Sequence, residues 1–296
     1  MISKANIIKC SAVLIIFAAG ICFTLSGQAP PKATKVANSP DTISATVNKP
    51  DITSVAVNKP DTTEVTVNEA TSKADVQGIV AKSELNNYVL KVIPAYEGGK
   101  YPYLLNNDYA NYNGVTENII YKGSPIAKAN SDGSKSSHCV GLTYEVFFKA
   151  MQERNKEAGI SPDNFNNMSI QNMKDFMLTW YAAQGSPKSQ GDQLAGAIVK
   201  YGLGTRITRL EDAKAGDFID FSRNKSGHTV VFINWVKDHK GNIAGFKYWS
   251  TQESTKGIGY KQEYFSDNPK GALKGAVNRN QLYIGRVGSI TNYKYY

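Results

Sequence analysis

Apolar residues recur at helical spacing in the middle of the chain. Within residues 136–156, apolar positions follow one another at i, i+3, i+7 and i+11, which places them on one face of a helix. That face carries Cys139, Leu142, Val146 and Ala150. Ser136 or Ser137 precedes the run as a candidate N-cap. The pattern predicts a helix with a thiol in its first turn.

Two more helical segments and then several strand segments follow. The helices are predicted at 169–183 and 192–202, and the second ends at Gly202, a residue type that favours helix C-termini. The strand segments are short and separated by Gly, Asn and Asp: 217–221, 228–236, 243–252, 258–265 and 281–288. Helices followed by antiparallel strands indicate an α+β domain.

The first residues have the pattern of an export signal. Lys4 and Lys9 precede an uncharged apolar run that extends from about Cys10 to Leu25. We expect residues 1–29 to be a secretory signal peptide, with a retained membrane anchor as the alternative. The residue before Cys22 is isoleucine rather than a small residue, which argues against lipidation. The protein is expected to be secreted or held in the cell envelope.

The segment that follows is a low-complexity repeat. Pro-Asp recurs at 40/41, 50/51 and 60/61, and Val-Asn at 47/48, 57/58 and 67/68, a period of ten residues. Repeats rich in Pro, Thr, Ser and Asn with isolated Val and Ile cannot bury a core, so we expect residues 30–78 to be a disordered linker. A β-solenoid is the alternative, but a proline in each short copy argues against it. The folded domain is then expected at 79–296.

Composition and charge exclude some partners. The chain of 296 residues is 41% hydrophobic and 20% charged, enough for at least one sizeable core. Its net charge of +9 is spread along the sequence, without the basic block of a nucleic-acid arm. We therefore expect no nucleic-acid partner and membrane contact only through the N-terminal segment. No metal-ligand cluster or phosphate loop is evident, so no cofactor and no metal are expected.

Cys139 is the only cysteine after residue 22. Disulfides are the usual fate of cysteine in exported proteins, so a lone thiol requires an explanation. One is an inert buried cysteine that packs like a small hydrophobe. The other is a nucleophile, because a helix N-terminus favours the thiolate and offers backbone N–H groups to an oxyanion.

A nucleophilic thiol needs a base, and the chain holds only three histidines. His138 adjoins Cys139 but points away from it on a helix, so we expect a surface residue. His239 lies in the polar turn "KDHKGN" and is expected to be exposed. His228 opens the most apolar strand, where a rigid sheet can hold it against the helix.

Two sequence segments resemble a known superfamily. "HCVGLTYEVF" is similar to the nucleophile helix of NlpC-type and CHAP-type papain-like cysteine peptidases and amidases, and "AGDFIDF" with "SGHTVVFINW" is similar to the turn and strands around their catalytic base. The resemblance covers roughly residues 100–290. It implies a papain-like fold with a nucleophile helix packed on an antiparallel sheet, Cys139 as nucleophile and His228 as general base.

The chain departs from that pattern in two places. His138 stands where the family has Asp or Ser, and His228 follows Cys139 by 89 positions, which leaves room for a helical insertion. The third catalytic group is sought by strand pairing. A hairpin turn at 236–243 places His228 opposite a residue near 251, so Gln252 or Ser250 is predicted to orient the imidazole. Glu253 is the rival if the register slips.

Three other residues were considered for this site. Asp217 is expected to fix a turn and Asp220 to be an exposed strand residue. Trp249, beside the proposed third group, is the aromatic residue expected to touch substrate.

Together these patterns predict an exported cysteine hydrolase that cleaves amide bonds. Peptidoglycan peptides are the expected substrate, on the grounds of the resemblance, export and positive charge. Two alternatives remain: a secreted peptidase or toxin directed at proteins, and a catalytically inactive surface-binding module of the same fold.

Overall fold

The computed structural model describes residues 73–96, 100–105, 108–182, 193–223, 226–270 and 273–296. The predicted signal peptide, and the linker up to residue 72, lie outside the described residues. Helix α1 (Lys73–Ala81) begins inside the segment predicted to be linker, and its Val80 belongs to the main core. Within the described residues, regular structure is thus already present at Lys73, before the predicted domain boundary at 79.

In the described residues the α-helices precede the strands of the large sheet, as predicted, but a short hairpin that was not predicted, β1 (Ile119–Tyr121) and β2 (Ser124–Ala127), lies between the second and the third α-helix. After α1 and the short α2 (Asn86–Val92) come the three anticipated helices: α3 (Cys139–Glu157), α4 (Ile170–Trp180) and α5 (Gln193–Lys200). Gly202, with φ +65°, ends the last of them in the left-handed conformation expected of a C-cap glycine. No helix in the described ranges is long and apolar enough to span a membrane.

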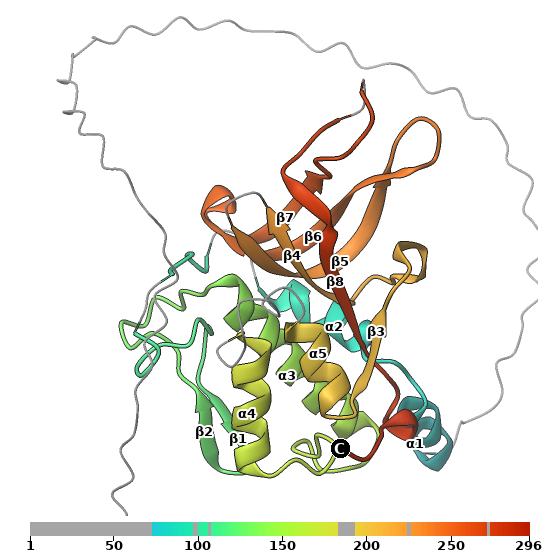
Figure 1. Cartoon of the computed structure of the whole chain (residues 1–296). Helices are drawn as coiled ribbons and strands as arrows, with labels where there is room; N and C mark the ends of the chain where they lie inside the picture. The colour runs from blue at the N-terminus through green and yellow to red at the C-terminus, as the bar shows by residue number, and fades with distance from the viewer. Residues whose placement is uncertain (1–72, 97–99, 106–107, 183–192, 224–225, 271–272) are drawn as a thin grey trace, which may run out of the picture. The chain divides into compact units, whose positions relative to one another are not determined.

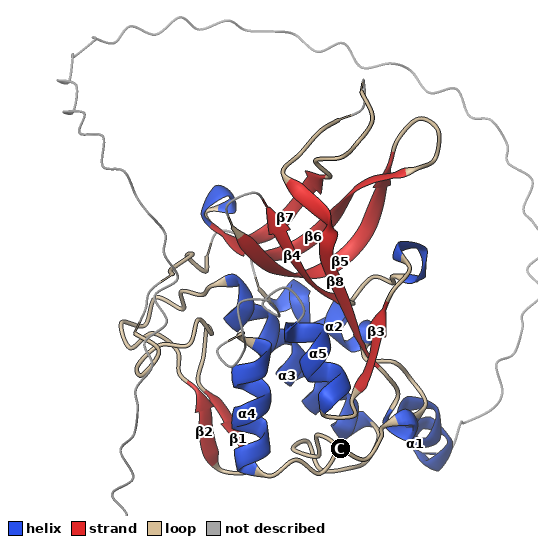
Figure 2. Cartoon of the chain, viewed as in Figure 1, coloured by secondary structure: helices blue, strands red, loops and turns tan. Residues whose placement is uncertain are grey.

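The strands form one large antiparallel sheet. Its order is β3-β8-β4-β5-β6-β7, and the strands are β3 (Gly204–Ile207), β4 (Phe218–Arg223), β5 (Gly227–Lys237), β6 (Ile243–Gln252), β7 (Gly257–Tyr264) and β8 (Val277–Val287). A separate hairpin pairs β1 (Ile119–Tyr121) with β2 (Ser124–Ala127). The helices and the large antiparallel sheet occupy separate layers, with the hairpin β1-β2 beside α4, which confirms the α+β prediction (Figures 1 and 2).

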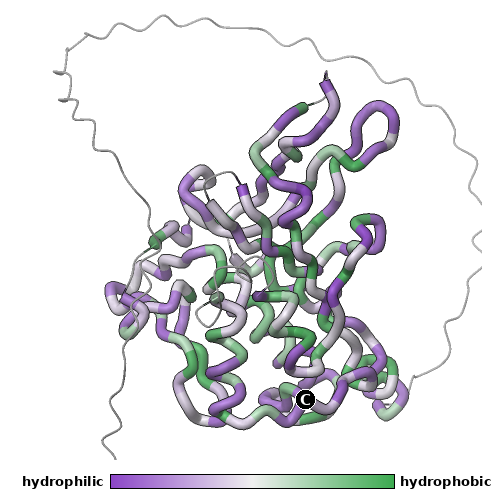
Figure 3. Tube along the Cα trace, viewed as in Figure 1, coloured by the Kyte–Doolittle hydropathy of each residue, from purple (hydrophilic) through white to green (hydrophobic). Residues whose placement is uncertain are grey.

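The sheet is apolar on both sides. One side, here called the helix face, contributes Phe218, Val231 and Trp249 to a core shared with α3 and α4. The other side, here called the far face, carries a second cluster that includes Phe221, Val230 and Tyr248. Hydrophobic segments accordingly run through the sheet as well as through the helices beneath it (Figure 3). Both faces exclude water, so burial alone does not identify the face that meets the helices.

A buried ion pair ties the start of β4 to the end of β8. Both carboxylate oxygens of Asp217 accept hydrogen bonds from Arg286, at 2.8 and 2.7 Å. The same carboxylate accepts from Asn86 Nδ2 on α2 and from the backbone N–H of Lys214. Asp217 thus fixes its turn, as predicted, and also joins three separate segments of the chain.

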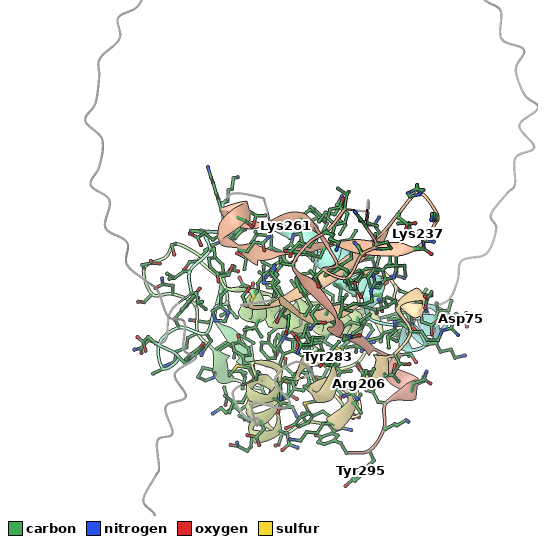
Figure 4. The ribbon with its side chains drawn as sticks, turned by 45° about the horizontal axis from the view of Figure 1, so that its top comes forward. Asp75, Arg206, Lys237, Lys261, Tyr283 and Tyr295 are labelled. Carbon is green, nitrogen blue, oxygen red and sulfur yellow. The ribbon has the colours of Figure 1, made fainter. Side chains whose placement is uncertain are left out.

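Charged and terminal residues lie at the periphery of this arrangement. Lys237 and Lys261 lie at separate ends of the sheet in Figure 4, and Tyr295 projects from the C-terminal segment. His239, in the turn between β5 and β6, is exposed as predicted.

Candidate active site

Helix α3 begins at the predicted thiol, but its cap differs from the prediction. Cys139 is the first helical residue, and His138 rather than Ser136 or Ser137 is the N-cap. Its Nδ1 accepts the backbone N–H of Gly141 at 3.3 Å. The expectation that His138 lies on the surface was wrong, because only 2% of the residue is exposed.

Three tyrosine rings enclose His138. Tyr109, Tyr112 and Tyr181 contact the imidazole edge-on, with ring centroids 6.5, 5.9 and 5.9 Å away. Burial lowers the pKa of His138 to about 4, so the ring is neutral at physiological pH. A neutral ring keeps Nδ1 free of a proton, which it must be to accept the Gly141 N–H.

The glycine that follows Cys139 by two positions is required by close backbone packing. A Cβ at Gly141 would overlap the carbonyl oxygens of Gly114 and Asn113, and a Cβ at Gly114 would overlap the His138 ring. The backbone N–H of His138 donates to the Gly114 carbonyl at 3.1 Å. The loop at 113–114 thus clamps the residues immediately before the thiol, and the first turn of α3 has little freedom to shift.

We expect His138→Ala to destabilise the domain by about 1 kcal/mol or more, because it removes the cap acceptor and leaves space between the tyrosines. His138→Asn should lose less, because asparagine is a good N-cap acceptor. Thermal unfolding of both variants beside wild type measures the difference. Equal stability of the alanine and asparagine variants would contradict the capping role.

Cys139 and His228 line the same pocket, which has a volume of about 150 Å³. Its wall is built by α3, the end of α4, β4 and the start of β5, and its lining residues include Cys139, Tyr181, Asp220, Ser222, His228 and Thr229. Helix α4 belongs to the segment predicted as an insertion between nucleophile and base. The insertion therefore closes one side of this pocket.

The Cys139 thiol meets the backbone of β5. The backbone N–H groups of Thr229 and Val140 lie beside it, and the residue is half-buried. Burial raises the pKa of the thiol, and the two N–H groups oppose that rise without cancelling it. The position at a helix N-terminus predicted a lowered pKa for this thiol; that expectation was wrong, because desolvation by burial is the largest influence and raises the pKa.

The imidazole of His228 lies on the far face of the sheet. β5 pairs with β4 in regular register, Phe221 opposite His228 and Phe218 opposite Val231. Strand residues alternate, so His228 shares a face with Val230, whereas Thr229 shares the helix face with Val231. The thiol thus lies on the helix side of β5 and the imidazole on the far side, and both are next to the backbone of residues 228–229.

Aromatic rings hold His228 in that position. Phe221 and Tyr248 contact the imidazole, with ring centroids 5.7 and 5.6 Å away. Nε2 is buried and has no hydrogen-bond partner among the described residues. Burial lowers the pKa of His228 to about 3, and the positive charge of Arg223 acts in the same direction. The imidazole is therefore neutral.

The predicted third group lies on the same face as His228. Residues 231 and 232 pair with 249 and 248, and continuing that register places Gln252, rather than residue 251, opposite His228. Gln252 Oε1 lies 3.2 Å from the Tyr248 hydroxyl, and Ser250 donates to the carbonyl of Thr229 at 2.8 Å. Gln252 thus interacts with Tyr248 and Ser250 with the backbone, and neither bonds to the imidazole. Glu253, the rival candidate, is exposed beyond the end of β6.

Two further expectations were wrong. Asp220 is half-buried at the pocket, where it accepts the Thr229 hydroxyl at 2.6 Å and the Leu194 N–H at 3.1 Å. Trp249 is 2% exposed and packs on Tyr96, so in this structure it lies in the core away from solvent. Alternation along β6 turns Trp249 toward the helices and away from the face that carries His228.

The sequence reasoning missed an ion pair beside the imidazole. Glu263 on β7 accepts hydrogen bonds from Arg223 Nε at 2.7 Å and from the Tyr248 hydroxyl at 2.6 Å. The sequence around Glu263 gives no sign of this pair, because Lys261, Gln262 and Glu263 are consecutive polar residues of β7. Among the described residues, no group of three or more His, Cys, Asp or Glu side chains is placed to hold a metal ion.

Comparison with known proteins provides no family for this chain. No protein-family model, no curated protein and no solved structure matches it.

Proposed function

We propose that this protein is an exported cysteine hydrolase of the papain-like kind, which cleaves an amide bond in peptidoglycan peptides. The observation that carries the proposal is the shared pocket: a thiol at the N-terminus of α3 and a histidine on the adjoining strand line the same cavity. The α3-on-sheet arrangement, with α4 and α5 as the insertion, agrees with the fold that the sequence resemblance implies.

Both reacting groups are neutral in the resting state. Burial raises the pKa of the Cys139 thiol and lowers that of the His228 imidazole, and both shifts oppose a thiolate–imidazolium pair. In the proposed reaction the thiol proton therefore passes to His228 as sulfur attacks the carbonyl carbon. Backbone N–H groups at the start of α3 would hold the oxyanion. His228 then returns the proton to the leaving amine, and water cleaves the thioester.

The thiol and the imidazole are not hydrogen-bonded to each other in the empty pocket that both residues line. In the resting structure the ring rests against Phe221 and Tyr248 on the far face. The thiol adjoins the backbone of Thr229, the residue that follows His228, at the edge of this pocket. Hydrogen bonds of catalytic groups are often long in empty sites and tighten in the substrate complex.

Digestion of purified peptidoglycan tests the proposal. Wild-type protein and the Cys139→Ala variant are incubated with several wall chemotypes, and the released fragments are identified by mass spectrometry. New peptide ends in the wild-type sample alone support amide cleavage in the wall. Cleavage of a denatured-protein mixture without wall fragments would instead indicate a protein-directed peptidase.

A second candidate function is a surface-binding module without turnover. The position of His228 favours it, because thiol and imidazole lie on opposite faces of β5 and neither pKa shift activates the thiol. In this reading Cys139 packs as a small hydrophobe and the pocket binds a wall component without cleaving it.

Alkylation of Cys139 separates the two candidates. With iodoacetamide at pH 7 we expect slower labelling than a model thiol and a rate that rises with pH, because the pKa of the thiol is raised. If His228 accepts the thiol proton, His228→Ala should slow labelling further, by roughly tenfold or more, while the exposed His239→Ala leaves it unchanged. Peptide mapping isolates the signal of Cys139 from that of Cys10 and Cys22. Equal rates in all three proteins would favour the binding module.

A further inference from the structure

Several ionisable side chains share the far face of the sheet with His228. Arg223 lies on β4, Tyr248 on β6, and Lys261 and Glu263 on β7, where they pair with Tyr248 and Phe246 across the sheet. The Glu263 side chain is 11% exposed and that of Arg223 is 18% exposed. These residues form a largely buried charged cluster directly beside an unpartnered histidine nitrogen.

The Tyr248 hydroxyl is the centre of this cluster. It lies 2.6 Å from Glu263 Oε1, 3.2 Å from Gln252 Oε1 and 3.4 Å from Arg223 NH2. A hydroxyl carries one proton, and the shortest contact is to a charged acceptor, so the proton points to Glu263. Gln252 Oε1 is a second, more distant acceptor of the same proton. With Arg223 donating to one lone pair, the hydroxyl oxygen keeps the other for a further donor.

Glu263 remains ionised in this setting. Although burial raises its pKa, hydrogen bonds from Arg223 and Tyr248 dominate and lower the pKa to about 2. The oxygen of Tyr248 is thus polarised by a full negative charge and is a better acceptor than a free phenol. Its ring already contacts the His228 imidazole.

We propose that Tyr248 and Glu263 are the positioning residues for His228: the imidazole Nε2–H donates to the Tyr248 hydroxyl, which in turn donates to Glu263. Nε2 is the nitrogen that is closed off from solvent without a partner, and this hydrogen bond would satisfy it. Nδ1 is then left without a proton, and it is the nitrogen that can receive one from Cys139. This inference rests on the proposed hydrolase function. It assigns the third catalytic group, which orients the base, to Glu263 on β7, acting through Tyr248 on β6.

The structure explains why neither predicted residue fills this role directly. Ser250 is engaged with the Thr229 carbonyl, and Gln252 bonds to Tyr248 rather than to the imidazole. A carboxylate that acts through a tyrosine hydroxyl has no fixed sequence spacing from the histidine, because β7 joins the arrangement only through its pairing with β6. Arg223 donates to both carboxylate oxygens of Glu263 and so fixes the direction of the carboxylate.

The tautomer of His228 provides a test that does not depend on turnover. Long-range ¹H–¹⁵N correlation spectra distinguish an Nε2–H from an Nδ1–H imidazole, and loss of signals in single histidine variants assigns the three residues. We expect the Nε2–H tautomer of His228 in wild type, and a mixture or the other tautomer in Tyr248→Phe and Glu263→Gln. Tyr260→Phe, an exposed tyrosine on β7, is the matched control and should behave as wild type. Thermal unfolding checks that each variant is folded.

Turnover supplies the second measurement. Tyr248→Phe and Glu263→Gln should lower kcat by roughly tenfold with little change in KM, and Glu263→Asp should recover part of the loss, since an orienting group is worth less than the base it orients. An Nδ1–H tautomer in wild type, or a tautomer unchanged in both variants, would overturn the proposal. If the tautomer responds but no protein cleaves any substrate, the positioning stands and the hydrolase function fails. If Cys139→Ala abolishes cleavage while Tyr248→Phe and Glu263→Gln match the control, the function stands and the positioning fails.

Discussion

Replacing either Cys139 or His228 by alanine is expected to remove nearly all amide hydrolysis, a loss of at least about a thousandfold in kcat. Without the thiol there is no nucleophile. Without the imidazole the thiol stays protonated at neutral pH, because burial raises its pKa. The double variant should be little worse than either single one, since groups that act as a unit have strongly non-additive effects. Steady-state kinetics on fragments identified in the peptidoglycan digest provide the measurement.

Matched substitutions separate a chemical from a structural cause. His239→Ala changes an exposed histidine and should keep wild-type activity. Ser250→Ala and Gln252→Ala should keep part of it, because these residues contact the site without taking a proton. If the Cys139→Ala variant hydrolysed the substrate at the wild-type rate, Cys139 could not be the nucleophile. Retained activity in His228→Ala alone would move the base to another residue.

The largest expected loss of stability follows Asp217→Ala. The substitution leaves Arg286, a largely buried cation, without the carboxylate that accepts two of its hydrogen bonds. Breaking one side of a buried ion pair costs about 3 to 5 kcal/mol, because the remaining charge stays desolvated and uncompensated. Asn86 and the Lys214 N–H also lose their shared acceptor. Urea unfolding followed by circular dichroism measures the change in the free energy of unfolding.

Two further variants check that interpretation. Glu211→Ala removes an exposed carboxylate from the neighbouring turn and should change the free energy of unfolding by less than about 0.5 kcal/mol. The pair Asp217→Leu and Arg286→Met removes both charges and should be less damaging than Asp217→Ala alone, because no unpaired charge remains. A loss below about 1 kcal/mol in Asp217→Ala would show that the ion pair contributes little.

Local patterns in the sequence predicted the position and type of most elements around the pocket. The helix that opens at Cys139, the strand bounds at 243 and 252, and the end of α5 at Gly202 all follow from apolar spacing and from residue types that favour helix ends. These features depend on neighbours within a few positions along the chain. Short elements such as α2 and β3 were missed, because three to seven residues carry too little periodicity to be recognised.

The residues around the thiol show where local patterns are insufficient. His138 was predicted to lie on the surface because adjacent residues on a helix point in different directions, so it does not share the buried face with Cys139. Packing by Tyr109, Tyr112 and Tyr181, which are distant in sequence, buries it and makes it the cap. The prediction of a lowered thiol pKa was wrong for the same reason. The helix dipole can be inferred from the helix itself, whereas desolvation depends on all the residues that cover the thiol.

By itself, the sequence determined that a lone thiol begins a helix, that His228 opens a strand, and that the domain is α+β. Only the tertiary structure decided on which side of that strand the imidazole lies and which carboxylate accompanies it. The strand after His228 is apolar at consecutive positions, with Val230 and Val231 both fully buried, so its alternation does not reveal which face meets α3. Strand pairing and helix docking make that choice, and the pairing of β7 with β6 brings Glu263 to Tyr248.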